Sequence, residues 1–247
     1  MELNLKDRIA VVTGAASGIG EAIARALAAE GCKLCIVDRD RNAAEKTAAS
    51  LRAKSIALDV GDADAVASAF EKIATKHGHI DILVNAAGLL STGPVADLPA
   101  KEWERVSQVN LAGIVYCVKA AIPAMKQRHS GRIINIASVS AERGGGSVGN
   151  TLYAATKAGV VALTKGLARE LGPDKITVNA IAPAIVNTAM THKLLTDEAL
   201  KRILARIPLG RLASLSDIAD LAVFLASDRA SFITGATIPV DGGILTT

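Results

Sequence analysis

The sequence predicts a doubly wound α/β protein in which one domain, residues 1–247, holds a parallel sheet of about seven strands with helices on both faces. Short apolar runs alternate with helix-length segments along most of the chain, and parallel strands joined by right-handed crossovers produce this alternation. Hydrophobic residues make up 50% of the chain and aromatic residues only 2%. This composition fits strands that are buried on both faces. No Pro/Ser-rich linker and no repeat divides the chain.

Seven apolar runs, each bounded by polar or glycine-containing segments, are the expected strands: Ile9–Thr13, Leu34–Val37, Ser55–Leu58, Ile82–Asn85, Ile133–Ala137, Ile176–Ile181 and Thr237–Val240. The expected helices between them include Gly20–Glu30, Ala63–Lys76, Trp103–Gln127, Leu152–Leu171 and Ser216–Ala226. The alternation breaks between Pro183 and Leu212, where the chain makes a long excursion. Such excursions tend to be lids or binding loops, so residues 188–211 are expected to cover the substrate, although a surface embellishment fits the pattern equally well.

Charge and hydropathy exclude several classes of protein. The formal net charge is +4, and the basic residues are scattered along the chain, whereas nucleic-acid binding favours clustered basic residues and aromatic platforms. Met1–Arg8 lacks the apolar core of a signal peptide. The longest uncharged stretch, Ile176–Thr191, is interrupted by polar residues and is short for a bilayer span. We therefore expect a cytoplasmic protein.

The three cysteines do not predict a disulfide framework, because their number is odd. Cys32 and Cys35 form a C-x-x-C pair, but Cys35 falls inside an expected strand. Three residues along an extended chain reverse the direction of the side chain, so the two thiols should point to opposite faces of the sheet. Neither a redox motif nor a metal site is expected.

Cofactor binding is first indicated by the turn Thr13-Gly14-Ala15-Ala16-Ser17-Gly18-Ile19-Gly20, which joins the first strand to the first helix. Its glycines let the backbone approach a pyrophosphate, and the helix N-terminus offers unpaired N–H groups and a positive dipole end. Asp38, at the end of the second strand, can accept hydrogen bonds from an adenosine ribose and repels a 2′-phosphate. Asp38 therefore favours NAD over NADP. Arg39 could reach a phosphate, but we interpret it as a solvated surface side chain.

Taken together, three motifs resemble those of the short-chain dehydrogenase/reductase family, classical type, and the resemblance covers essentially the whole chain. The motifs are the turn Thr13–Gly20 with its Gly-x-x-x-Gly-x-Gly spacing, Asn85-Ala86-Ala87-Gly88 after the fourth strand, and Tyr153-x-x-x-Lys157. Val240-Asp241-Gly242-Gly243 ends the match.

The resemblance implies a Rossmann fold with a dinucleotide laid across the carboxyl ends of the strands. The cofactor-binding positions that it implies are Gly14, Ser17, Gly18, Ile19, Gly20, Asp38, Asp59, Val60, Asn85, Gly88, Tyr153, Lys157, Pro183, Val186 and Thr188. Asp59 and Val60 would hold the adenine, and Val186 and Thr188 the carboxamide. Family members usually carry Pro-Gly where this chain has Pro183-Ala184. The backbone conformation at Ala184 is therefore expected to differ from that of the family.

The chemistry requires a proton donor and acceptor at the substrate oxygen. Tyr153 and Lys157 are four residues apart in an expected helix and so share one face. We expect the lysine ammonium to lower the pKa of Tyr153, which would make the tyrosine the acid in reduction and the base in oxidation. Lys157 would also hold the nicotinamide ribose.

Two further residues complete the expected catalytic set. Ser138, where the fifth strand ends, should orient the substrate oxygen. It lies 15 residues before Tyr153, whereas the commoner family separation of 13 would select Ser140, which stays open as the alternative. Asn110 matches the family's fourth catalytic member, which would hold a water in a proton relay with Lys157; without the resemblance it is an amide that interrupts a helix.

The substrate is expected to lie under residues 142–152 and 188–211. The first of these segments is glycine-rich and carries the polar residues Arg143, Ser147, Asn150 and Thr151. A polar lining favours a small hydroxylated substrate of the sugar or polyol type. The alternatives are an NADPH-dependent 3-oxoacyl-thioester reductase of the same family and a non-catalytic NAD-binding regulator. The resemblance also implies a homotetramer in which 103–127 and 152–171 pack across one interface and the C-terminal strand lies near another.

Overall fold

Seven parallel strands form one sheet in the order β3-β2-β1-β4-β5-β6-β7. The structure is a computed structural model that describes residues 2–146 and 148–246. The strands are β1 Ile9–Thr13, β2 Lys33–Asp38, β3 Lys54–Ala57, β4 Ile82–Asn85, β5 Gly131–Ile136, β6 Ile176–Pro183 and β7 Thr237–Val240. The chain winds outward from β1 to β3 and then returns through β4 to the other half of the sheet. The crevice between β1 and β4 is thus the topological switch point, where doubly wound folds bind ligands.

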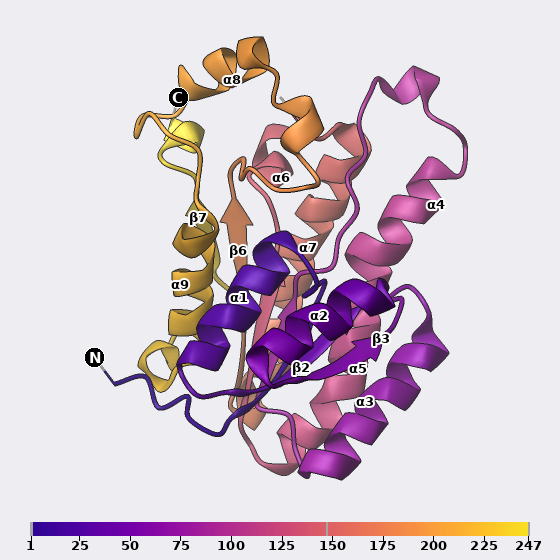
Figure 1. The fold of residues 1–247 in the computed structure, drawn as a ribbon, viewed down its shortest axis with the longest axis vertical. Coiled ribbons are helices and arrows are strands. Elements are labelled where there is room, and N and C mark those ends of the chain that lie inside the picture. Colours follow the sequence, from indigo (N-terminus) through magenta and orange to yellow (C-terminus); the bar gives the residue numbers. More distant parts are fainter. Residues whose placement is uncertain (1, 147, 247) are drawn as a thin grey trace.

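Two hydrophobic cores lie on opposite faces of this sheet. One face is covered by α1 Gly18–Ala29, α2 Arg41–Leu51 and α9 Leu215–Ala226 (Figure 1). The other is covered by α3 Ala63–His77, α5 Gly113–Gln127 and α7 Thr151–Leu171. Adjacent strand residues alternate between the two cores, as Val11 and Val12 of β1 do, because successive side chains on a strand point to opposite faces.

The predicted orientation of Cys32 and Cys35 toward opposite faces of the sheet is confirmed by these two cores. Cys32 is buried in the core that contains α1, and Cys35 in the core that contains α3. Burial raises the pKa of Cys32 to about 12 and that of Cys35 to about 11, so both thiols are protonated at neutral pH. Among the described residues no group of three or more His, Cys, Asp or Glu side chains could hold a metal ion.

Three shorter elements surround the carboxyl ends of the strands. They are α4 Glu102–Ser107, α6 Ser140–Arg143 and α8 Asp197–Leu204. Helix α4 continues into α5 through a π-helical turn, Gln108–Ala112. Helix α8 belongs to the excursion after β6 and lies at the top of the molecule in Figure 1. A single β-bridge between Val186 and Ala213 closes the neck of this excursion.

The excursion has a small apolar core of its own. Ile203 and Ile207 pack with Val139, which follows β5, and with Ile244 near the C-terminus. The N–H of Leu209 donates to the carbonyl oxygen of Gly242 at 3.1 Å. The C-terminal turn therefore anchors the excursion to the sheet.

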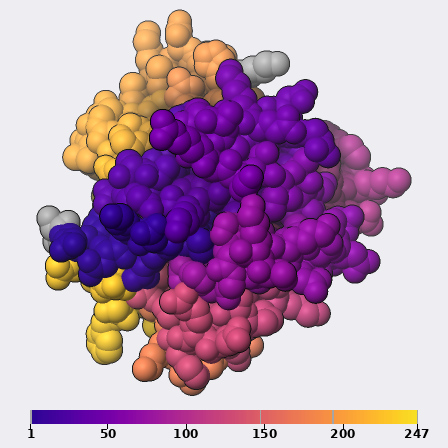
Figure 2. All heavy atoms as spheres, turned by 60° about the horizontal axis from the view of Figure 1, so that its bottom comes forward, coloured from indigo at the N-terminus to yellow at the C-terminus, as the bar shows by residue number. Residues whose placement is uncertain are grey.

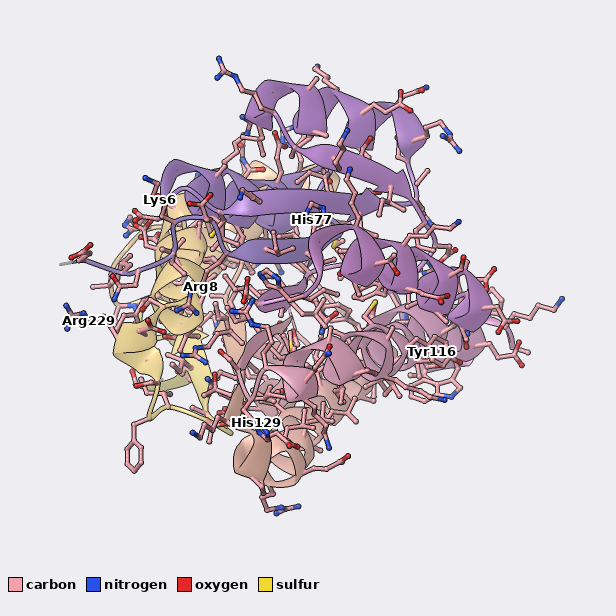
Figure 3. All side chains as sticks on the ribbon, turned by 90° about the horizontal axis from the view of Figure 1, so that it is seen from below. Lys6, Arg8, His77, Tyr116, His129 and Arg229 are labelled. Carbon is pink, nitrogen blue, oxygen red and sulfur yellow. The ribbon has the colours of Figure 1, made fainter. Side chains whose placement is uncertain are left out.

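On the side of the amino ends of the strands, the N-terminal residues form an ion pair and a hydrogen bond with the segment after α9. Arg8 pairs with Asp228 at 2.6 Å, and Arg229 Nε donates to the carbonyl oxygen of Glu2 at 3.0 Å. Figure 2 shows indigo and yellow atoms in contact there, and Figure 3 shows Lys6, Arg8 and Arg229 on the same side of the molecule.

By length and composition alone, one helical stretch of the described residues, Glu102–Gln127, could cross a membrane. Its face toward the sheet is packed with buried residues, among them Val106, Ile114 and Val118. Core helices pass the same test of composition, so the stretch is weak evidence for a span.

Candidate active site

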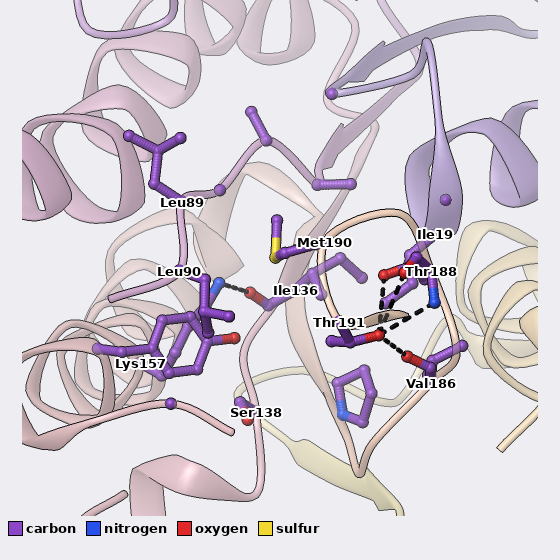
Figure 4. Close-up of a pocket in the computed structure, with 18 of the residues that line it drawn as sticks. Ile19, Leu89, Leu90, Ile136, Ser138, Lys157, Val186, Thr188, Met190 and Thr191 are labelled. Carbon is purple, nitrogen blue, oxygen red and sulfur yellow. Dashed lines mark hydrogen bonds between the residues drawn. The ribbon is translucent and has the colours of Figure 1, made fainter. Parts of the chain in front are cut away.

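A cavity of about 390 Å³ opens at the carboxyl ends of the strands. Its lining comes from the segments that follow β1 to β6, so residues far apart in the sequence meet there. Every predicted cofactor-binding residue except Asn85 lines this cavity, and so does Ser138. Figure 4 shows Ser138 and Lys157 on one side of it and Ile19, Val186 and Thr188 on the other.

The turn between β1 and α1 depends on glycine at two positions. A Cβ on Gly14, whose φ is 64°, would lie 2.7 Å from Cα of Ala87, and a Cβ on Gly20 would overlap the carbonyl oxygen of Gly14. Ser17 caps α1 through its backbone only, because its side chain makes no capping hydrogen bond. The first N–H groups of the helix therefore face the cavity without that acceptor, which is the arrangement that binds a phosphate. These residues fit a dinucleotide.

Thr13 joins this turn to the neighbouring one. Its hydroxyl accepts hydrogen bonds from the N–H groups of Ala86 and Ala87, at 3.2 and 3.3 Å, and donates to the carbonyl oxygen of Val84 at 3.4 Å. Thr13 was not among the residues predicted to be functional. A threonine at the last position of a strand, before a glycine turn, is the signal that could have identified it.

The carboxylate of Asp38 is held in place by two backbone donors. The N–H of Ala16 donates to Oδ2 at 3.0 Å, and that of Asp40 donates to Oδ1 at 3.1 Å. The group is thus fixed at the cavity with lone pairs left for further donors. Arg39 is exposed, as expected, but it also lines the cavity, so it is not merely a surface residue remote from the site.

Asn85 does not line the cavity, and its expected part in cofactor binding stays a prediction. Its Nδ2 donates to Oδ1 of Asn135 at 2.9 Å, and Nδ2 of Asn135 donates to Oγ1 of Thr164 at 3.0 Å. All three side chains are buried. Asn85 therefore ties β4 to β5 and α7 beneath the site.

Tyr153 is positioned by the start of α7. The side chain of Asn150 caps the helix, accepting from the N–H of Tyr153 at 3.0 Å and donating from Nδ2 to Ser91 at 2.9 Å. A Cβ on Gly149 would collide with the Tyr153 ring. Gly149 and Asn150 thus set where the phenol lies, and neither had been assigned this role from the sequence.

Ser138 is fixed by the sheet although β5 ends at Ile136. The N–H groups of Ala137 and Val139 donate to the carbonyl oxygens of Ile181 and Pro183, at 2.8 and 3.1 Å, so the pairing with β6 continues past Ser138. The Ser138 hydroxyl lies close enough to Tyr153 to lower the pKa of the phenol. The N–H of Ser140 donates to Oγ of Ser138 at 3.1 Å, so Ser140 reaches this site through its backbone and also lines the cavity.

Lys157 is buried, and its Nζ donates to the carbonyl oxygen of Ile136 at 2.7 Å (Figure 4). Nζ lies 5.7 Å from the centroid of the Tyr153 ring. Burial lowers the pKa of Lys157 to about 8. The Lys157 ammonium thus lies at the cavity floor, where burial destabilises its charged form relative to a lysine in water.

The expected lowering of the Tyr153 pKa is wrong for the chain alone. Burial raises the pKa of Tyr153 to about 12, and the neighbouring Ser138 hydroxyl opposes this rise. The cause is that removal of the phenolate from water outweighs this stabilisation. Tyr153 is therefore neutral and able to donate a proton.

Asn110 lies in the π-helical turn and does not line the cavity. Its Oδ1 accepts from the N–H of Leu89 at 2.7 Å, and its Nδ2 donates to the carbonyl oxygen of Leu89 at 2.9 Å and to Thr156 at 3.1 Å. These bonds attach the segment after β4 to α7. π-Turns occur frequently at functional sites, and here the turn places a fully buried amide beside the cavity wall.

The wall after β6 is arranged by Thr191. Its Oγ1 donates to the carbonyl oxygen of Val186 at 2.6 Å and accepts from the N–H of Thr188 at 3.0 Å (Figure 4). Ala184, where glycine is usual in the family, has no positive φ, so alanine fits the local backbone. Thr191 was not selected from the sequence, although the Thr-x-x-Thr spacing is typical of local side-chain-to-backbone bonds.

The substrate end of the cavity is less polar than expected. Arg143 and Ser140 line it, whereas Asn150 and Thr151 do not, and Ser147 lies outside the described residues. The excursion contributes Thr188–Thr191 to the wall, while its helix α8 stands away from it. The other lining side chains at this end are mainly apolar, namely Val139, Val148, Ile185, Met190 and Ile244.

The arrangement can handle a proton at a substrate oxygen. Ser138, Tyr153 and Lys157 line the same cavity, and Lys157 Nζ lies near the Tyr153 ring. A dinucleotide held by the turn Thr13–Gly20 would supply or accept the hydride. The chain's own groups would orient the substrate oxygen and donate or accept the proton. Carbonyl reduction requires both this proton transfer and the hydride transfer.

Known proteins match this chain over nearly its whole length. A family model described as enoyl-(acyl carrier protein) reductase matches residues 14–245. The chain is 41% identical to the 3-oxoacyl-(acyl-carrier-protein) reductase FabG of Escherichia coli (strain K12), over 98% of this chain and 99% of FabG. It is 40% identical to the meso-2,3-butanediol dehydrogenase of Serratia marcescens, over 98% and 96% of the two chains.

A solved structure from Beutenbergia cavernae, described as an NAD(P) dependent gluconate 5-dehydrogenase with NADP bound at low occupancy, superimposes with a TM-score of 0.94. It is 38% identical and covers 100% of both chains. The chain therefore belongs to the short-chain dehydrogenase/reductase family, and it is an oxidoreductase with a nucleotide-cofactor site.

Proposed function

We propose that this protein is an NAD(H)-dependent oxidoreductase that interconverts a secondary alcohol and a ketone on a small hydroxylated substrate of the sugar or polyol type. The observation that carries the proposal is the convergence of Ser138, Tyr153 and Lys157 on the cavity that the glycine turn also lines. Relatives named as a butanediol dehydrogenase and a gluconate 5-dehydrogenase support a small hydroxylated substrate.

In this proposal Tyr153 protonates the carbonyl oxygen during reduction and accepts the proton during oxidation. Ser138 holds the oxygen in place, and Lys157 holds the nicotinamide ribose. Asn110 acts through the turn after β4 and through a water in the proton relay. A neutral Tyr153 is the form that reduction needs, and a bound cationic nicotinamide would favour the phenolate that oxidation needs.

The preference for NAD(H) rests on Asp38. Its carboxylate is pinned where an adenosine ribose would lie, and a 2′-phosphate would meet a fixed negative charge. Asp59 and Val60 would hold the adenine, and Val186 and Thr188 the carboxamide. Arg39 supports the opposite preference because it lines the same cavity.

The test is a titration of the enzyme with NADH and with NADPH, monitored by nucleotide fluorescence, in the parent and in Asp38→Asn. We expect tighter binding of NADH, and a ratio of the two affinities that falls at least about tenfold in the variant, because a charged hydrogen-bond partner is lost. Asp40→Asn is the matched control, since it removes the same charge two residues away and asparagine caps a helix equally well. Tighter binding of NADPH by the parent would contradict the NAD(H) proposal.

A second candidate function is reduction of a 3-oxoacyl thioester with NADPH. It is favoured by the 41% identity to FabG and by Arg39 at the cavity. Turnover of acetoacetyl-coenzyme A with NADPH, together with no oxidation of polyols, would establish it in place of our proposal.

We also propose that residues 1–247 act as one domain with a lid at 188–211, and that the protein is a cytoplasmic homotetramer. The helical stretch Glu102–Gln127 supports the assembly, because Trp103 and Val115 on it are 44% and 41% exposed in the single chain. An apolar face of this kind is commonly covered by a second copy.

A further inference from the structure

Arg143 is a half-buried cation that the proposed reaction does not use. It is the last residue of α6 and lines the substrate end of the cavity. No hydrogen bond or ion pair joins its guanidinium to any residue within the ranges 2–146 and 148–246. Partial removal of a charge from water costs free energy that a partner of opposite charge would offset, so an anion bound at the cavity would complete the surroundings of Arg143.

The acidic residues of the cavity cannot serve as that partner. Asp38 and Asp59 line it at the ends of β2 and β3, whereas α6 follows β5. Three strand spacings separate β2 from β5, which is about 14 Å at about 4.8 Å a strand, beyond the screening length at physiological salt. Glu142, next to Arg143, is exposed and does not line the cavity.

The position of Arg143 relative to the reacting groups is suited to substrate recognition. Ser140 and Arg143 are three residues apart on α6, so they share a face, and both line the cavity. The N–H of Ser140 donates to Oγ of Ser138, so one short segment carries the serine of the reaction, a second hydroxyl and then the guanidinium. Around them the lining is mainly apolar, which strengthens a charged contact.

We propose that Arg143 binds an anionic group of the substrate, a carboxylate or a phosphate, so that the preferred substrate is a small hydroxy acid or a hydroxylated phosphate ester. This inference rests on the proposed function and narrows its substrate class. The planar guanidinium can donate two parallel hydrogen bonds to either group. Such a contact fixes the distance between the anion and the carbon that is oxidised, and it discriminates against neutral alcohols of the same length.

The experiment compares substrates that differ by one charge. D-Gluconate and D-glucitol form one pair, 3-hydroxybutyrate and its methyl ester form another, and D-glucitol 6-phosphate tests the phosphate. Each is oxidised by the parent, by Arg143→Gln and by Arg143→Lys, with whichever nicotinamide dinucleotide the parent binds more tightly. Arg169→Gln is the matched control, because Arg169 is an exposed arginine on α7 that does not line the cavity.

We expect the parent to prefer the charged member of a pair. Arg143→Gln should lower kcat/KM for that member by about ten- to a hundredfold, mainly through KM, because a charged contact made in both the ground and transition states is lost. Turnover of the neutral member and NADH affinity should not change, and Arg143→Lys should recover part of the loss. Preference for gluconate or 3-hydroxybutyrate identifies a carboxylate, and preference for glucitol 6-phosphate identifies a phosphate.

Two outcomes would overturn the inference while leaving the proposed function intact: equal losses on charged and neutral substrates, or oxidation of neutral alcohols with no preference for the anion. If no substrate of the panel is oxidised, the proposed function fails. Calorimetric titration of the enzyme–NADH complex with each pair then decides the inference separately, because equal affinity for gluconate and glucitol, or equal affinity in Arg143→Gln, would refute it.

Discussion

Tyr153 and Lys157 have pKa values displaced toward their neutral forms, and burial is the cause in both cases. The pKa of Tyr153 is raised to about 12 and that of Lys157 is lowered to about 8. The sequence identified both residues and their common helix face, but it could not give the direction of the tyrosine shift. That direction depends on how deeply the helix is buried and on the carbonyl oxygen of Ile136 that the lysine bonds, and neither is local in sequence.

Replacement of Tyr153 by phenylalanine should remove the proton donor while leaving the site intact. We expect kcat for alcohol oxidation to fall by about 10²- to 10⁴-fold, the usual contribution of a positioned acid or base. NADH affinity, measured by fluorescence titration, should stay within about twofold of the parent value, since the aromatic ring remains and only the hydroxyl is lost. A variant with at least a third of the parent kcat would exclude Tyr153 as the proton donor.

The depressed pKa of Lys157 predicts how stability depends on pH. Between pH 8 and about 10.4, its value in unfolded chains, the unfolded chain binds more protons at this residue than the folded chain does, so the free energy of unfolding rises with pH. The raised pKa of Tyr153 acts in the opposite direction, but only between pH 10 and 12, where the unfolded chain loses its proton first.

Urea midpoints at pH 7.5, 8.5 and 9.5 would measure this effect. They should increase in the parent relative to Lys157→Met, in which the titrating group is absent. Equal slopes in the two proteins would show that Lys157 keeps an ordinary pKa in the folded state.

At the scale of elements, the strands were predicted well because a buried parallel strand is a continuous apolar run. β1, β4 and β7 have the expected bounds, and the other four differ by one or two residues at their ends. Helix α2, Arg41–Leu51, was not among the expected helices, because only Ala44, Thr47 and Ala48 of it are buried. Small residues that let a helix approach a sheet closely leave little apolar periodicity in the sequence.

The turn before α7 offers a test of how an element positions a catalytic group. Gly149→Ala would push a Cβ into the Tyr153 ring, so we expect kcat to fall at least about tenfold with little change in NADH affinity, because small displacements of reacting groups are costly. The measurement is steady-state kinetics with a parallel fluorescence titration.

Gly166→Ala is the control for that substitution, since Gly166 lies in α7, the helix that carries Tyr153, and an added Cβ there would meet nothing within 4 Å. It should leave kcat unchanged and raise the free energy of unfolding by about 0.5–1 kcal/mol, the helix preference of alanine over glycine. If Gly149→Ala retained full activity, the ring would have room to move and the turn would not set its position.

At the scale of the molecule, all seven strands are parallel, so their carboxyl ends, and the segments that form the cavity wall, lie on the same side of the sheet. This explains why the sequence could predict nearly all of the cofactor-lining residues once the strand ends were known. It could not predict that Asn85 and Asn110 lie behind the wall, because their hydrogen-bond partners, Asn135 and Leu89, are set by tertiary packing. The lining at the substrate end was also predicted to be more polar than it is.

The tetramer proposal belongs to this scale as well. Light scattering with size exclusion should give about four times the chain mass of 25.4 kDa. Val115→Glu, which places a charge on the exposed face of α5, should shift the protein to a smaller species, because a buried unpaired charge destabilises an interface. A parent protein that elutes as a monomer would contradict the proposed assembly.

The bridge between Val186 and Ala213 has a consequence for how such an enzyme could change its substrate. Because the two ends of the excursion are held together at this neck, the segment between them behaves as a closed loop, and the entropy of closing a loop grows only slowly with its length. The part of this segment beyond Thr191 could therefore change in length at little cost in loop-closure entropy, as long as Ile203 and Ile207 keep their apolar contacts. Substrate specificity would then change through this one segment, while Ser138, Tyr153 and Lys157 keep their positions.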